Sequence, residues 1–505
     1  MSLELWLLVG CSGSEPEVVR DSAEVPLSLS LLVTDNPYNP LSAVATVTAS
    51  QDATVAITAS SGSRSHTTPM VVLEAGMPTE VLMLGLRADQ TWSLMASGEG
   101  AASAVVEVAI AALPAGYPAC EVTVDAGAVV PEDEVVCTNG DTTDGGIYFC
   151  MDRTGEIVWA VSQIEAEGVH AFRMLSDGTL AMLSDTRSMV SFLTDRGEPI
   201  VYYTPSWFKD RTRFFHEWID LHEVIEITEG PWAGAVAILT ATYEHPDSKV
   251  PDTRGPGIIV FDRETGEVLW DWLILGEDLE DGLAIDDKID LERTGLYSSP
   301  ANFFHGNALL HRVEDGRDIF WMSLRHQDWL IKIDAETDAV LWRLGREGDF
   351  TLVDDLDAAT PQLLPDDDWM YQQHAPEWQH TDGDRTALVL FDNGLRRPAE
   401  PKDSYSRVLG FEIDESTMTA APTFAFGSGD VASGDHFFST GVGDADVTLG
   451  GDRLYFVKGY GPDPFLAEVG YPDGGLSWKL VCPDQDELYR LSHYPSLYEM
   501  TWKTD

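Results

Sequence analysis

A hairpin unit that recurs along the chain constrains its fold more than any other feature. Each copy consists of an apolar strand, an acidic turn and a second strand that carries an aromatic residue. Asp and Gly suit such tight turns, and the aromatic residue is expected to pack against a neighbouring sheet. Four clear copies span 147–159, 190–202, 258–270 and 330–342, and two weaker copies lie at 411–414 and 471–478. Six copies of one hairpin predict six blades of a β-propeller.

The segment before the repeat has a different pattern. Short runs of alternating apolar and polar residues at 27–33, 43–49 and 54–59 are separated by turn residues. This pattern is typical of a small antiparallel β-sandwich. The sequence therefore predicts an all-β protein, with a β-sandwich at 24–115 followed by a six-bladed β-propeller at 120–505. A set of unrelated β-sandwich domains is the alternative, and the repeated turn favours the propeller.

The N-terminus predicts export. Residues 1–23 read as a lipoprotein-type signal and a polar tether, because Leu8-Val-Gly-Cys11 resembles a bacterial lipobox. Cys11 is then a candidate for a lipid anchor, although no Lys or Arg precedes it. The protein is expected to be periplasmic or a membrane-anchored lipoprotein. The other four cysteines (Cys120, Cys137, Cys150 and Cys482) predict two disulfides, with three pairings open.

Charge and motif content exclude several classes of partner. With 85 acidic and 31 basic residues, the net charge is −54. Nucleic acids and anionic membranes bind clustered Lys and Arg, so neither is an expected partner. The acidic surface is suited to salt. No CxxC zinc spacing, EF-hand loop or Gly-rich phosphate loop occurs, so we expect no metal and no cofactor.

Histidines in front of the hairpins are the candidate site residues. His170, His222, His305 and His374 each lie at the start of a predicted first strand. First strands line the channel of a propeller, so side chains at this repeat position would converge on one mouth of the channel. A single His at a strand end is usually a packing residue. Four at one repeat position favour a functional cluster.

Arg325 adds a positive charge to this cluster. It follows the second predicted strand of the His305 blade, in a turn at the same end as the histidine. A forked guanidinium near several histidines is suited to an oxyanion such as sulfate or phosphate. The alternative for Arg325 is an ion pair with a loop carboxylate.

An ordered set of short motifs over about residues 145 to 460 resembles the bacterial arylsulfate sulfotransferases. The motifs are His222-Glu-Val, Phe304-His-Gly-Asn, Ser323-Leu-Arg-His-Gln, Leu341-Trp-Arg-Leu-Gly, Gln373-His-Ala-Pro-Glu and Phe391-Asp-Asn-Gly. The resemblance implies transfer of a sulfuryl group from a phenolic sulfate donor to a phenolic acceptor, without a nucleotide sulfate donor. It implies that His374 is the nucleophile that becomes sulfated, and that His222, His305 and Arg325 surround the sulfuryl group. The family commonly has His-His-Asp where this chain has Leu221-His222-Glu223, which weakens the assignment of His222.

Elementary chemistry agrees with this interpretation. A neutral imidazole is a good nucleophile, and neighbouring cations lower its pKa and stabilise the charge on a transferring sulfuryl group. A covalent intermediate implies ping-pong kinetics. Two alternatives remain open: a propeller that binds ligands or proteins without turnover, and an aryl sulfate hydrolase. The sequence leaves open the natural donor and acceptor and the oligomeric state.

Overall fold

The computed structural model describes residues 26–127, 133–142, 145–162, 169–184, 188–242, 255–274, 304–395, 397, 405–427, 437–448 and 450–501. The predicted lipid anchor at Cys11 and the loop at 276–300 lie outside these residues. Strands dominate the described chain, so the all-β prediction is confirmed. Among the described residues, the helical elements are α1 (Pro205–Phe208), α3 (Leu497–Thr501), and the 3₁₀ turns η3 (Arg325–Gln327) and η4 (Asp366–Asp368). None of the described helices is long and apolar enough to cross a membrane.

The first nine strands form two sheets that share one apolar core. Side chains alternate along β7, where Trp92, Leu94 and Ala96 are buried and the residues between them are partly exposed, as expected for a half-buried strand. These three residues pack in one cluster with Ala45 and Val47 of the other sheet. One sheet contains β1 (Leu29–Asp35), β2 (Ala43–Ala49) and β6 (Thr79–Met83). The other contains β3 (Ala53–Ser61), β4 (Arg64–Thr67), β5 (Val71–Leu73), β7 (Gln90–Gly98), β8 (Ala101–Ala102) and β9 (Val106–Ile110).

The remaining strands form six antiparallel sheets over the described residues, each of four or five strands. The first sheet contains β35 (Tyr489–Tyr494), β11 (Val135–Thr142), β12 (Gly145–Asp152) and β13 (Ile157–Ser162). The second contains β14 (Val169–Met174), β15 (Leu180–Ser184), β16 (Met189–Leu193) and β17 (Pro199–Tyr203). The third contains β18 (Trp218–Glu226), β19 (Val236–Thr242), β20 (Gly255–Phe261) and β21 (Val268–Leu273). The next is β22 (Gly306–Glu314), β23 (Arg317–Leu324), β24 (Trp329–Asp334) and β25 (Ala339–Gly345). The fifth contains β27 (His374–Asp382), β28 (Arg385–Asp392), β29 (Arg407–Asp414) and β30 (Thr419–Gly427), and β26 (Thr351–Leu352) pairs parallel to β30. The sixth contains β31 (Asp444–Val447), β32 (Arg453–Lys458), β33 (Phe465–Gly470) and β34 (Leu476–Val481), with β10 (Glu121–Asp125) at the outer edge.

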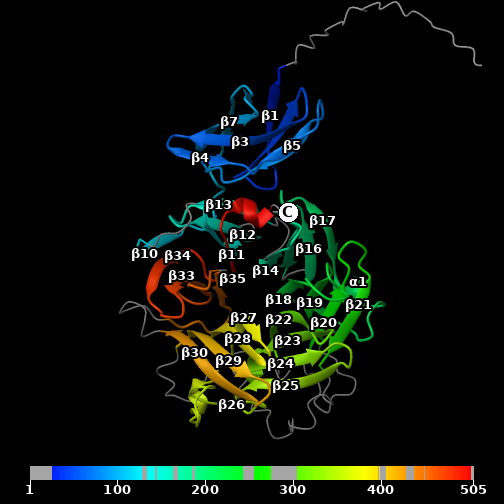
Figure 1. The fold of residues 1–505 in the computed structure, drawn as a ribbon, viewed down its shortest axis with the longest axis vertical. Helices are drawn as coiled ribbons and strands as arrows, with labels where there is room; N and C mark the ends of the chain where they lie inside the picture. The colour runs from blue at the N-terminus through cyan, green and yellow to red at the C-terminus, as the bar shows by residue number, and fades with distance from the viewer. Residues whose placement is uncertain are drawn as a thin grey trace, which may run out of the picture.

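These six sheets are arranged as the blades of a β-propeller (Figure 1). The inner strands β14, β18, β22, β27, β31 and β35 each contact the next in that order, and β35 contacts β14, so the contacts close a ring. The ring closes because β35, from the C-terminus, pairs with β11 of the first blade. A closed ring brings the ends of six inner strands to one axis, although long stretches of sequence separate them.

The predicted hairpins are the outer strand pairs of the blades, from β12–β13 to β33–β34. In the turns, Oδ1 of Asp152 and of Asp262 accepts hydrogen bonds from backbone N–H groups two to four residues further on. The turns end in left-handed backbone, with φ of 83° at Gly155 and 70° at Gly266. Asp338 takes this place in the fourth copy at φ 60°, which explains the missing glycine there.

The second copy departs from the expected packing. Tyr202, the aromatic residue predicted to pack on the neighbouring sheet, is 66% exposed. Tyr203 is buried instead, with its ring centroid 5.3 Å from that of Phe261 in the next blade. Successive side chains of a strand point to opposite faces of the sheet. A shift of one residue along this hairpin therefore places Tyr203, rather than Tyr202, on the buried face.

Two disulfides resolve the pairing that the sequence left open. Cys137 and Cys150 are opposite each other on β11 and β12. Cys120 and Cys482 flank the pair β10–β34, so this bond ties the strand that enters the propeller to its last blade. Disulfides of this kind persist in oxidising compartments, in agreement with the predicted export.

Removing the Cys120–Cys482 bond is expected to destabilise the fold more than removing Cys137–Cys150. The sequence separations are 362 and 13 residues, and the chain-entropy model then gives about 6 and about 3 kcal/mol. Chemical denaturation of the Cys120→Ser/Cys482→Ser and Cys137→Ser/Cys150→Ser variants measures both losses in free energy of unfolding. An equal or larger loss for the shorter loop would contradict the entropic explanation.

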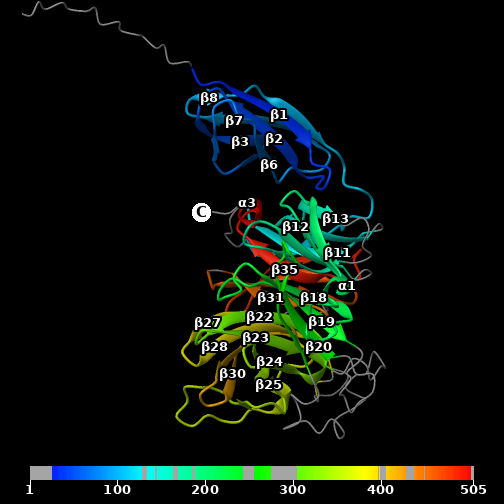
Figure 2. The same cartoon turned by 90° about the vertical axis from the view of Figure 1, so that its right-hand side faces the viewer.

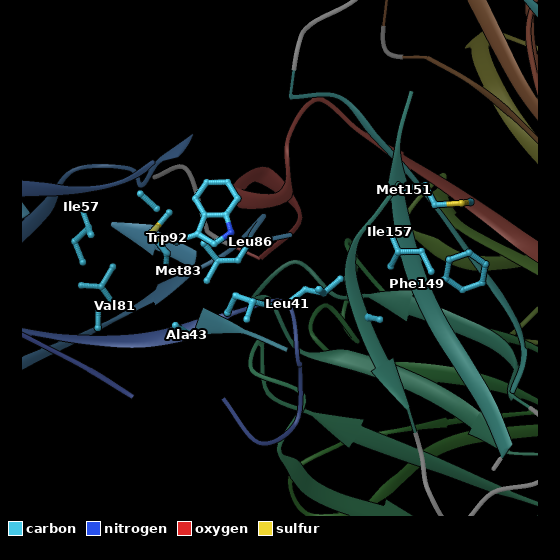
Figure 3. Packing of buried hydrophobic residues seen from close by; sticks show 14 of the residues in the cluster. Leu41, Ala43, Ile57, Val81, Met83, Leu86, Trp92, Phe149, Met151 and Ile157 are labelled. Atoms are coloured by element: carbon cyan, nitrogen blue, oxygen red, sulfur yellow. The ribbon is translucent and has the colours of Figure 1, made fainter. Parts of the chain in front are cut away.

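The N-terminal sheets rest on the propeller next to α3 (Figures 1 and 2). One cluster of buried residues runs from Trp92 and Leu86 in the N-terminal part to Phe149 and Ile157 in the first blade (Figure 3). A cavity of about 570 Å³ lies at this junction. Its lining includes Arg87, which is paired with Asp152, but none of the predicted site residues.

Candidate active site

Three of the predicted histidines meet where inner strands β18, β22 and β27 surround the propeller axis (Figure 1). His374 is the first residue of β27, and His305 immediately precedes β22. His222 lies four residues inside β18, at a shift in the pairing register, rather than at its start as predicted. The ring centroid of His222 lies 5.0 Å from that of His305 and 6.0 Å from that of His374. The side chain of His170 lies outside the described part of the chain.

His222 and His305 lie within hydrogen-bond distance of each other. Their Nε2 atoms are 3.1 Å apart, and two imidazole nitrogens at that distance need one proton between them, since one must donate and the other accept. Nδ1 of His222 lies 3.2 Å from the hydroxyl of Tyr489. This pair can therefore give up or take back a proton within the site.

The environment of His374 determines which of its nitrogens can attack. Nδ1 of His374 lies 2.6 Å from Oδ1 of Asn393. The orientation of this amide is fixed, because Nδ2 of Asn393 donates to the carbonyls of Ser439 and Val442, both at 2.9 Å. The oxygen of Asn393 therefore accepts from Nδ1–H of His374, so the neutral ring carries its lone pair on Nε2. His374 is thus prepared as a nucleophile through Nε2.

Burial and nearby positive charge keep His374 neutral. The residue is 1% exposed. Burial, followed by the charges of Arg325 and His222, lowers the pKa of His374 well below 6.5, and these effects outweigh the opposing hydrogen bond to Asn393. The folded protein resists protonation of this ring, so this residue makes folding less favourable as the pH falls below about 6.5.

The pH profile of turnover is expected to reflect this shift. A neutral His374 is active above its pKa, so the acid limb of kcat/KM should lie below pH 6.5. In an Asn393→Asp variant the added carboxylate favours the imidazolium, so the pKa of His374 rises and the acid limb moves to higher pH. Steady-state rates measured across pH for both proteins test this. A wild-type acid limb above pH 6.5, or no shift in the variant, would contradict the assignment.

Arg325 is held rigidly beside the histidines. It opens η3 between β23 and β24, as predicted, and is 5% exposed. Its backbone N–H donates to the carbonyl of His305 at 2.9 Å. Nη2 donates to the carbonyl of Thr440 at 2.6 Å, and Nη1 donates to Nε2 of His326 at 3.0 Å. The guanidinium is therefore a fixed positive charge near His374, as an oxyanion site requires.

Left-handed backbone gathers at the site. Six non-glycine residues of the strand ends and loops around it have φ between 46° and 59°: His305, Asp328, Gln372, Ala375, Val442 and Arg490. Such conformations cost on the order of 1–3 kcal/mol each and persist where surrounding contacts enforce them. Their concentration here is typical of a functional site that is organised before its ligand binds.

The structure adds residues that the sequence did not single out. His326 belongs to the Ser323-Leu-Arg-His-Gln motif, from which no role for it follows, but its ring centroid lies 4.7 Å from that of His305. Asn393 belongs to the Phe391-Asp-Asn-Gly motif, from which no role for it follows. Tyr489 and Arg490 come from β35 and gave no signal in the sequence, because the copy of the repeat that precedes them is weak. Among the described residues, no group of three or more His, Cys, Asp or Glu side chains is arranged to hold a metal ion.

A family model described as "Arylsulfotransferase (ASST)" matches residues 130–463, which is more than half of the chain and contains all four predicted site residues. The chain belongs to the arylsulfotransferase family. This membership confirms the resemblance first seen in the histidine and arginine motifs. Tyr489 and Arg490 lie beyond the matched residues.

This member of the arylsulfotransferase family is similar to several individual proteins. It is 26% identical over 297 residues to the arylsulfate sulfotransferase AssT of Lelliottia amnigena, in an alignment that covers 50% of this chain and 47% of that protein. The chain thus spans about half the length of that curated relative. A solved Bacteroides caccae protein of unknown function matches with a TM-score of 0.42 and 10% identity, over 72% of this chain and 98% of that one. The periplasmic gluconolactonase PpgL of Pseudomonas aeruginosa matches with a TM-score of 0.36 and 9% identity, over 87% and 99%. The propeller assignment rests on the strand pairing rather than on these distant structures.

Proposed function

We propose that this protein is an aryl sulfotransferase that works through a sulfated His374. The observation that carries the proposal is the arrangement around His374: a buried neutral imidazole with its lone pair on Nε2, beside the fixed guanidinium of Arg325. A nucleophile next to a cation is what transfer of an anionic group requires. Family membership and the curated relative named an arylsulfate sulfotransferase support the same activity.

In the first half-reaction, Nε2 of His374 attacks the sulfur of a phenolic sulfate ester. The N–S bond forms as the bond from sulfur to the phenolic oxygen breaks. The His222–His305 pair, which starts this step with one positive charge, passes the proton between its Nε2 atoms to the leaving phenolate and becomes neutral. Arg325 stabilises the negative charge on the sulfuryl oxygens during transfer. The product is a phenol and an enzyme with a sulfuryl group on His374.

The second half-reaction reverses these steps with another phenol. Its hydroxyl gives its proton to the His222–His305 pair, its oxygen bonds to sulfur, and the N–S bond to His374 breaks. The acceptor leaves as a sulfate ester, and both the nucleophile and the shared proton are restored. Ping-pong kinetics follow, because the first product leaves before the acceptor reacts.

The location of the protein remains part of the proposal. An exported or lipid-anchored protein agrees with two disulfides, which form in oxidising compartments. Cys11 stays a prediction for lipid attachment. Palmitate labelling of the protein and of a Cys11→Ser variant in a bacterial host would test it, with equal labelling of both counting against an anchor there.

The decisive test supplies para-nitrophenyl sulfate as donor and phenol as acceptor. We expect release of nitrophenolate together with formation of phenyl sulfate, measured by absorbance and by mass spectrometry. Release of nitrophenolate with inorganic sulfate and no phenyl sulfate, across several phenols, would instead indicate a hydrolase. A folded protein that turns over none of several aryl sulfates would indicate a binding propeller.

A further inference from the structure

Arg490 connects the ring-closing strand β35 to the backbone of two histidine strands. It is 5% exposed. Its Nη2 and Nε donate to the carbonyl of His222 at 2.6 and 3.1 Å, and Nη2 also lies 3.1 Å from the carbonyl of Asn307, two residues after His305. One guanidinium therefore binds main-chain oxygens of β18 and β22 at the level of the site.

The same set of bonds continues to the strand of His374. Nδ2 of Asn307 donates to the carbonyl of Gln373 at 2.8 Å, and Gln373 directly precedes His374. Asn307 is fully buried, so water does not compete for this bond. Arg490 and Asn307 thus join the backbones of three strands, each of which carries one histidine of the site.

The charge of Arg490 is balanced by buried carboxylates. Nη2 lies 2.7 Å from Oε2 of Glu223, and Nη1 lies 4.0 Å from Oδ1 of Asp444. Although burial opposes its charge, Glu223 and Asp444 raise the pKa of Arg490, and Asp446 adds to this. Arg173 faces the same carboxylates, with Nη2 at 3.4 Å from Oε1 of Glu223. Arg490 is therefore a permanent cation at this place.

A lysine could not replace these bonds. Three N–H groups of one rigid planar group, one on Nε and two on Nη2, reach two carbonyl oxygens and a carboxylate, whereas an ammonium carries its three donors on one nitrogen at the end of a flexible stem. The backbone of Arg490 is also in the left-handed conformation, with φ 55°. Such a conformation in a non-glycine residue persists where surrounding contacts enforce it.

We propose that Arg490 is a positioning residue that holds β18 and β22 in the arrangement where His222 and His305 share their proton. The catalytic consequence rests on the proposed function. Arg490 does not touch the sulfuryl group; it acts through the carbonyls of His222 and Asn307. The ring-closing strand is then part of the active site, although it lies outside the residues that the family model matches.

The test compares Arg490→Lys with a matched control, Arg453→Met. Arg453 is also held in a largely buried ionic network, with Glu134 and Glu468, but contacts no site residue among its described partners. Displacement of a catalytic group by about 1 Å can cost about 10²-fold in rate. We expect Arg490→Lys to lower kcat by about that factor, to leave KM for the donor nearly unchanged and to shift the pH profile. Arg453→Met is expected to lower only stability.

A measurement without substrate separates this proposal from the proposed function. Nitrogen-15 NMR of the imidazoles reports which ring nitrogens of His222 and His305 are protonated, and Arg490→Lys should change both signals. If the wild-type protein turns over no aryl sulfate, the proposed function fails, while the NMR comparison still decides the role of Arg490.

A double variant guards against failure to fold. Arg490→Met alone leaves the buried Glu223 with only its longer contact to Arg173, whereas Arg490→Met/Glu223→Gln removes both charges. We expect the folded double variant to show the same changes as Arg490→Lys. Unchanged imidazole signals and an unchanged pH profile in a folded Arg490→Lys or double variant would overturn the positioning role.

Discussion

Replacing His374 with alanine is expected to reduce turnover of aryl sulfates by on the order of 10⁴-fold or more, because losing a covalent nucleophile removes the reaction path itself. The peptide that contains His374 should gain the mass of a sulfuryl group when the wild-type protein meets a donor without an acceptor. The variant should show no such adduct. Mass spectrometry of the digested protein and the rate of phenol release measure both effects.

The matched control is His380→Ala. His380 lies on the same strand, β27, but is exposed at its far end. It should retain full activity and the adduct on His374. The His374→Ala variant leaves Oδ1 of Asn393 without its donor, which costs about 1–3 kcal/mol of stability. Circular dichroism and thermal unfolding must therefore show that this variant folds. Phenol release by the wild-type protein without an adduct on any histidine would refute the covalent step.

Replacing Arg325 with lysine is expected to lower kcat by about 10³-fold, the range seen when a fixed donor or arginine is removed from a transferring anionic group. A lysine keeps the charge but cannot bind the Thr440 carbonyl and His326 while presenting a fork to the sulfuryl oxygens. Both half-reactions pass through similar charge, so formation and breakdown of the adduct should both slow. Rapid-quench measurement of the two steps tests this.

Arg317→Lys provides the control for Arg325→Lys. Arg317 begins β23, whose other end leads to Arg325, and it pairs with Asp334 away from the histidines. Its replacement should change neither step. A loss confined to KM for the donor in Arg325→Lys, with kcat intact, would show that Arg325 binds the ground state only and would contradict its role in transfer.

The sequence by itself determined the class of fold and the main residues of the site. The repeated hairpin carries its own turn signals, an Asp that accepts backbone N–H groups and a residue that tolerates left-handed backbone. Such signals lie within a few residues of each other, so they can be recognised in the sequence without knowledge of the fold. Their repetition then implied that equivalent strand starts share one axis. That step predicted a meeting of His170, His222, His305 and His374. The structure brings the last three together, and the side chain of His170 lies outside its described part.

Only the tertiary structure decided the tautomer of His374 and the position of His222. The tautomer of His374 depends on Asn393, whose own orientation depends on carbonyls of Ser439 and Val442 some fifty residues away. The position of His222 depends on a register shift in β18, and a one-residue shift reverses the face of a side chain. Neither the hydrogen bonds nor the register has a local sequence signal.

The first blade, which β35 completes, shows the same division most clearly. Tyr489 and Arg490 reach the site because β35 returns from the C-terminus to complete the first blade. Pairing between such distant segments depends on how the whole ring closes, and neither segment encodes it alone. The sequence thus determined which repeating unit folds and which histidines it carries. Closure of the ring, through non-local strand pairing and the Cys120–Cys482 bond, decided which other side chains surround them.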